Sequence, residues 1–223
     1  MSGWEKVAGA GGHISQVYLI EINRQARACK SACDRTLVLG ERLRSGNPMS
    51  PTDFEELGER VEQAVSCAAS LRNLIFGSGA PRDRKLKDFW KERTKWLQKL
   101  MENPVLPTIQ NVSARNSLEH FDERMDTWAF EWAHRPAQEQ GWIGAFDCIV
   151  KSRGDWGQAE SSKELVRCYI ADESMFVIRD DEVYIPELMK EANIVIRQTR
   201  RFNAAHTAMW KSTGASPQII VPF

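Results

Sequence analysis

The stretch "SPTDFEELGERVEQAVSCAASLRNLIF" (residues 50–76) decides the fold, because it reads as one continuous helix. Ser50 is placed to act as the N-cap, Pro51 suits the first helical position, and Asp53 lies in the first turn, where a carboxylate favours the helix dipole. The apolar side chains recur every three or four residues, which predicts one buried face. These side chains are Phe54, Leu57, Val61, Ala64, Val65, Ala68, Leu71 and Ile75.

The segment before this stretch has the same periodicity. Residues 14–44 predict a second long helix, and "SGNP" (45–48) ends it. Because so short a turn joins the two helices, we expect an antiparallel helical hairpin. Residues 1–13, which contain "GAGG", predict a flexible N-terminal arm.

Two more helices are predicted after the hairpin. The first covers residues 86–101, where "ENPVLP" breaks it, and the second covers residues 112–134 and stops before Pro136. Residues 14–140 are therefore expected to form one helical bundle.

The pattern of apolar and polar residues changes after Gly141. Short strands are predicted at 165–171, 175–179 and 182–185, with a two-residue turn at Asp180–Asp181, followed by a final helix over 186–211. The predicted fold class is mainly α, an antiparallel helical bundle with a small antiparallel β meander inserted before the last helix. We interpret residues 141–223 as a C-terminal elaboration whose final helix packs on the bundle.

Composition narrows the classes of function. The 223 residues include 30 basic and 30 acidic ones, which argues against a broad basic coat but leaves room for a local basic groove. No long apolar window or export signal is found, so we expect a cytoplasmic protein with no membrane association and with reduced thiols. Cys29 and Cys33 share a helical face and are expected in the core rather than in half a metal site. No metal or other cofactor is predicted.

One polar cluster, "ARNSLEHFDERMD" (114–126), carries possible chemistry. On a helix, Asn116 and His120 project within about 40° of each other, while Arg115 stands about 140° from His120. A histidine can move a proton, and an arginine can stabilise a phosphorane-like transition state, so the set suits phosphodiester cleavage without a metal. Spacing alone favours a solvated face on which Arg115 pairs with Glu119.

The segment "RNSLEH" (115–120) resembles the R-x4-H motif of the HEPN superfamily, including the polar residue directly after the arginine. The mainly helical surroundings over residues 14–135 are similar as well. The resemblance implies a metal-independent endoribonuclease in which Arg115 contacts the scissile phosphate, His120 transfers a proton and Asn116 supports it. It also implies a homodimer in which two facing motifs form one composite cleft, with a role in defence or RNA processing.

Two other segments are candidates for binding RNA. Arg197, Arg200 and Arg201, with Phe202, could hold an RNA backbone and stack a base, although an ordinary solvated helix end has the same pattern. The basic stretch 83–96 carries Phe89, Trp90 and Trp96, which we expect in the core rather than under bases. The alternative to an enzyme is a non-catalytic helical module that binds RNA, a nucleotide or a protein partner, with the tryptophans at its interface.

Overall fold

The structure, a computed structural model, describes residues 13–77, 84–110, 148–153, 167–178 and 181–212, and also positions 126, 129–131, 133, 134 and 136. It describes the backbone alone at 13–15, 84, 85 and 202–212. Among the predicted features, the N-terminal arm up to residue 12 lies outside the described residues, and so does most of the helix predicted over 112–134. The same holds for the first residue of the turn predicted at 180–181.

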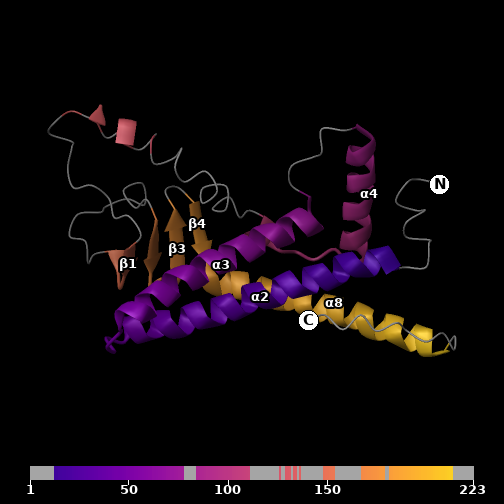
Figure 1. Cartoon of the computed structure of the whole chain (residues 1–223), viewed down its shortest axis with the longest axis horizontal. Helices are drawn as coiled ribbons and strands as arrows, with labels where there is room; N and C mark the ends of the chain where they lie inside the picture. Colours follow the sequence, from indigo (N-terminus) through magenta and orange to yellow (C-terminus); the bar gives the residue numbers. More distant parts are fainter. Residues whose placement is uncertain are drawn as a thin grey trace.

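Two long antiparallel helices form the base of the molecule, as the sequence predicts (Figure 1). They are α2 (His13–Arg44) and α3 (Pro51–Ile75), joined by a six-residue connection. The apolar face of α3 is buried as the periodicity requires, with Leu57, Val61, Ala64, Val65, Ala68, Leu71 and Ile75 almost free of solvent. Of the apolar positions predicted for this helix, only Phe54 stays half-buried.

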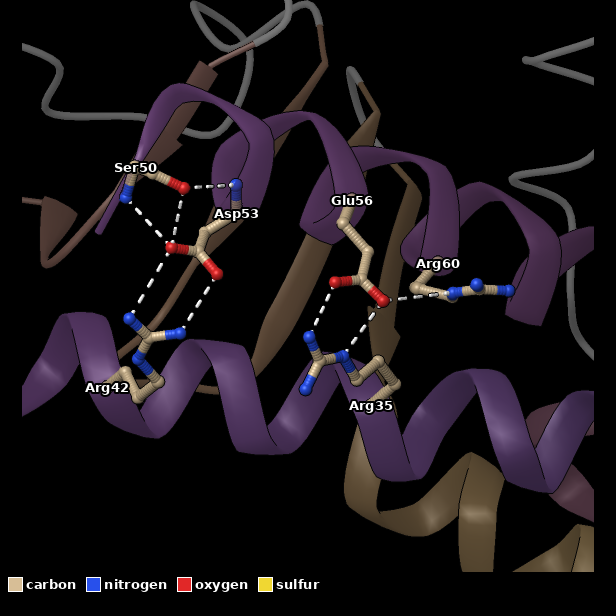
Figure 2. Close-up of polar contacts among 6 residues, drawn as sticks. All are labelled: Arg35, Arg42, Ser50, Asp53, Glu56 and Arg60. Atoms are coloured by element: carbon tan, nitrogen blue, oxygen red, sulfur yellow. Dashed lines mark hydrogen bonds and ion pairs between the residues drawn. The ribbon is translucent and has the colours of Figure 1, made fainter.

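The start of α3 is fixed by the predicted cap (Figure 2). The Ser50 hydroxyl accepts a bond from the Asp53 backbone N–H at 3.2 Å, and the Asp53 carboxylate accepts one from the Ser50 N–H at 2.8 Å. The Arg42 guanidinium on α2 contacts the same carboxylate at 2.9 Å. The helix cap is therefore also a link between the two helices.

A second link lies two turns closer to the middle of the hairpin (Figure 2). The Nε of Arg35 donates to the Glu56 carboxylate at 2.8 Å, and the Arg60 Nε lies 3.7 Å from that same carboxylate. Because Arg35 faces Glu56 and Arg42 faces Asp53, the two links together set the antiparallel register of α2 and α3.

A small sheet stands beside α3 (Figure 1). Its strands, in spatial order, are β1 (Cys148–Val150), β2 (Cys168–Ile170), β3 (Met175–Ile178) and β4 (Asp181–Tyr184). The predicted antiparallel meander is confirmed for β2, β3 and β4. The sequence analysis did not predict β1, which joins the sheet parallel to β2, with Cys148 opposite Cys168.

The last helix, α8 (Ile185–Ser212), begins directly after β4 and crosses beneath α2 (Figure 1). The Asn23 side chain on α2 donates to the Thr199 hydroxyl on α8 at 2.6 Å. The buried Glu191 carboxylate accepts from the backbone N–H groups of Thr108 and Ile109, both at 2.8 Å, at the short helix α5 (Pro107–Gln110). These contacts hold α8 against both the hairpin and α5.

One hydrophobic core joins the helices and one face of the sheet. Cys29 and Cys33 lie fully buried in it, as expected from their shared face. From the sheet, Tyr169 and Phe176, which are partners across β2 and β3, reach this core. Their neighbours on the opposite face of the sheet form a second, smaller buried cluster: Cys148, Val150, Cys168, Ile170, Met175 and Val177.

The predicted third helix is α4 (Arg84–Leu100), which stands steeply against the hairpin (Figure 1). Gly77, just past the end of α3, adopts a φ of 70°, and a Cβ there would lie 2.2 Å from the Trp90 ring. Trp90, Phe89 and Trp96 are half-buried, so they contribute to packing, as expected. Among the described residues, no helix is both long and apolar enough to cross a bilayer.

Candidate functional site

The motif residues Arg115, Asn116 and His120 lie outside the residues that the structure describes. The far end of the helix predicted for 112–134 is described in part: positions 126, 129–131 and 133 are helical. At this end the backbone N–H of His134 donates to the Phe130 carbonyl at 3.2 Å, and the ring Nδ1 lies 2.7 Å from the same oxygen. The roles of the three motif residues stay predictions.

The three arginines predicted to bind RNA are exposed on α8. By helical geometry, Arg197, Arg200 and Arg201 span about 100° of the helix circumference, so they share one face. The guanidinium of Arg201 lies 3.7 Å from the carboxylate of Glu102, just beyond the end of α4, and both side chains are well exposed. RNA binding by this face stays a prediction, but its guanidinium groups are in solvent, where a phosphate could reach them.

The opposite face of α8 explains why the arginines point outward. Thr199 and Val195 are fully buried, and the Thr199 hydroxyl both donates to the Val195 carbonyl and accepts from Asn23. These contacts hold this side of α8 against α2, so the face that carries the three arginines has a fixed orientation.

A cavity of about 450 Å³ lies between α3 and the sheet. Glu55, Glu59 and Glu62 line it from α3, and its apolar lining includes Phe54 and Phe176. Across it, the Arg167 guanidinium at the start of β2 lies 2.7 Å from the Glu62 carboxylate. The cavity is therefore acidic along the helix and apolar toward the sheet, which is unsuited to an anionic RNA backbone.

Two buried cysteine thiols, those of Cys29 and Cys168, are poorly suited to nucleophilic chemistry. A hydrogen bond with the Cys148 thiol, and then burial, raises the pKa of Cys168 far above its usual range. A hydrogen bond with Cys33, and then burial, does the same for the pKa of Cys29. Since the thiolate is the reactive form, these protonated thiols serve packing.

The described residues contain no group of three or more His, Cys, Asp or Glu side chains arranged to hold a metal ion. The sequence analysis did not anticipate the cavity, because one of its walls is β1. Three residues of alternating environment give no usable periodicity, so "CIV" (148–150) carried no signal.

Comparisons of the chain with protein-family models, with curated proteins and with solved structures gave no match.

Proposed function

We propose that the chain is a metal-independent endoribonuclease of HEPN type, which acts in the cytoplasm as a homodimer in a defence or RNA-processing role. The observation that carries the proposal is the sequence Arg115-Asn116-x3-His120, set on a predicted helix that follows a hairpin of two long helices. The mainly helical architecture and the outward-facing arginines of α8 support it.

In the proposed reaction, a 2′-hydroxyl attacks the adjacent phosphorus. The new O2′–P bond forms as the P–O5′ bond breaks, which leaves a 2′,3′-cyclic phosphate and a 5′-hydroxyl. Arg115 stabilises the negative charge that builds up on the phosphoryl oxygens, and His120 moves a proton at O2′ or at the leaving O5′. Asn116 orients the histidine or a substrate oxygen.

Helix geometry supports the proposed homodimer, which the resemblance implies. Because Arg115 stands about 140° from His120 around the helix axis, one helix presents an incomplete site. A second copy of the motif, facing the first, supplies an arginine and a histidine from the other direction. The composite cleft then holds the cation and the proton-transfer group on both sides of one phosphate.

A cleavage assay in excess EDTA tests the proposal. Purified protein should cut single-stranded RNA, and His120→Ala should reduce the rate by at least about 100-fold, the usual contribution of a general acid or base. The matched control is His134→Ala, since His134 lies on the same predicted helix and is exposed. This control variant should cut at the wild-type rate, and both variants should melt at the wild-type temperature.

A non-catalytic RNA-binding module is the second candidate, and the exposed face of Arg197, Arg200 and Arg201 favours it. The same assay separates the two. If wild-type protein binds RNA but leaves it intact, the ribonuclease proposal is wrong and the binding module stands. If His120→Ala cuts as fast as its parent, the assignment of the chemistry to His120 is wrong.

A further inference from the structure

A row of lysines follows the exposed side of α4. The helix carries seven basic residues and two acidic ones, although the whole chain has equal numbers of both. Lys87, Lys91, Lys95 and Lys99 recur every four residues, and all four are exposed. Each step advances about 6 Å along the axis and about 40° around it, so the lysine row extends over roughly 18 Å.

The other side of α4 packs against the rest of the protein. Leu97 is fully buried and Thr94 nearly so, and the Trp90 ring packs over Gly77. The Gln98 side chain donates to the Ile75 carbonyl at the end of α3, at 3.1 Å. Since the apolar side is anchored in this way, the lysine row is presented to solvent in a fixed orientation.

Apart from Lys99, which lies in the last turn and suits the helix dipole, the lysine row does not help α4 to fold. Like charges four residues apart repel each other on a helix, and the first turn of α4 has no acidic residue to complement the dipole. Within the described part of the chain, none of the four lysines forms an ion pair with a carboxylate. Such a concentration of unbalanced charge is better explained by a ligand of opposite charge.

We propose that the lysine row of α4 binds the backbone of single-stranded RNA. A stacked nucleic-acid strand carries one negative charge per roughly 3.4 Å of helix axis, so a stacked strand beside the lysine row presents about five phosphates. The end of the row lies near the arginine face of α8, because Glu102, just beyond α4, contacts Arg201 at 3.7 Å. The choice of RNA among polyanions rests on the proposed function.

Two other anionic partners fit the lysine row less well. An amphipathic helix binds a bilayer by inserting its apolar face, but the apolar face of α4 is packed on the hairpin. Protein interfaces are built around aromatic and arginine anchors and are depleted of lysine. Evenly spaced lysines without apolar anchors suit a repeating, flexible polyanion.

Fluorescence anisotropy with a labelled single-stranded RNA tests this inference, in the His120→Ala background so that the RNA stays intact. The variant Lys91→Gln/Lys95→Gln should reduce the steepness of log affinity against log salt by about 1.4 and weaken binding about 25-fold near 0.1 M salt. The matched control, Arg44→Gln/Lys151→Gln, removes two exposed charges away from both the lysine row and the arginine face of α8 and should bind like its parent. Lys91→Arg/Lys95→Arg keeps the charges and should retain the affinity.

Equal binding by the two glutamine variants, at equal melting temperatures, would overturn the inference. It would also be overturned if the lysine row were needed for binding phosphatidylserine vesicles or a polyglutamate peptide but not RNA. The inference and the proposed function fail separately. If the wild type never cuts RNA but Lys91→Gln/Lys95→Gln weakens RNA binding, the lysine row remains an RNA-binding surface and only the proposed function is wrong. If the wild type cuts RNA but the lysine substitutions leave RNA binding unchanged, only the proposed RNA-binding surface is refuted.

Discussion

At the scale of single residues, aromatic rings pack against glycines that leave room for them. Gly40 on α2 lies against Tyr169 of β2, and a Cβ on Gly40 would approach the Tyr169 hydroxyl oxygen to 2.4 Å. Because the Tyr169 ring is nearly free of solvent, it has little space to move aside. The contact fixes how closely the sheet approaches the hairpin. Burial also raises the pKa of Tyr169 to about 12.

Gly40→Ala should therefore destabilise the chain by about 1–3 kcal/mol, the usual cost of overpacking a core. The control is Gly58→Ala on α3, where a Cβ meets nothing within 4 Å and the better helix propensity should add about 0.5–1 kcal/mol. Adding Tyr169→Phe to Gly40→Ala removes the clashing oxygen and should recover part of the loss. Urea denaturation measures all three variants, and a Gly40→Ala variant as stable as Gly58→Ala would refute this role.

At the scale of elements, the sequence predicted most of what the structure shows. Local signals predicted the cap at Ser50, the buried apolar face of α3 and the final helix. Periodicity and stop signals are properties of a single segment, so they predict one element at a time. β1 and its parallel pairing with β2 were not predicted, because parallel pairing depends on a partner about 20 residues away. The basic character of residues 83–96 was recognised in the sequence, but the exposure of Lys87, Lys91, Lys95 and Lys99 along one side of α4 follows only from the structure.

The links between α2 and α3 predict how stability depends on pH. The Ser50 backbone N–H, its hydroxyl and then the Arg42 guanidinium lower the pKa of Asp53 below its ordinary value of 3.8. A hydrogen bond from Arg35 lowers the pKa of Glu56 below 4.5. Both carboxylates therefore stabilise the fold above these values, and this stabilisation is lost as the pH falls through the lowered pKa values.

Asp53→Asn should lower the melting temperature by about 2–4 °C at pH 6, the effect of losing one helix cap in a chain of this size. The difference from the wild type should shrink as the pH falls below 3.8 and through the lowered pKa of Asp53, because protonation removes the charge that these contacts stabilise. Glu59→Gln is the control, since Glu59 is an exposed carboxylate on the same helix. A deficit for Asp53→Asn that stays constant from pH 6 to pH 2.5 would contradict the assigned charge interaction.

At the scale of the whole molecule, charge is separated although the chain is neutral. α3 carries five acidic and two basic residues and lines the cavity beside the sheet, whereas α4 carries seven basic and two acidic ones. The arginine face of α8 lies next to the end of α4. This separation of charge favours a polyanion on the α4–α8 side, where we propose that RNA binds, over the α3 side, and the overall composition could not reveal it.

The candidate site was predictable only as a pattern. The motif at Arg115 and His120 could be named from sequence because spacing and residue type are local properties. The facing of two copies of the motif could not be predicted from the sequence, since a composite cleft depends on how two chains meet. The direction of the α8 arginines likewise became clear only with Thr199 seen against Asn23.

The central claim is that this chain cuts RNA through the 2′-hydroxyl without a metal. The most direct measurement compares a single-stranded RNA with its all-deoxy analogue, both incubated with wild-type protein in excess EDTA. We expect the RNA to be cut to products ending in a 2′,3′-cyclic phosphate, and the DNA to stay intact. RNA that remains whole at protein concentrations that bind it, or DNA cut at the same rate, would contradict the account.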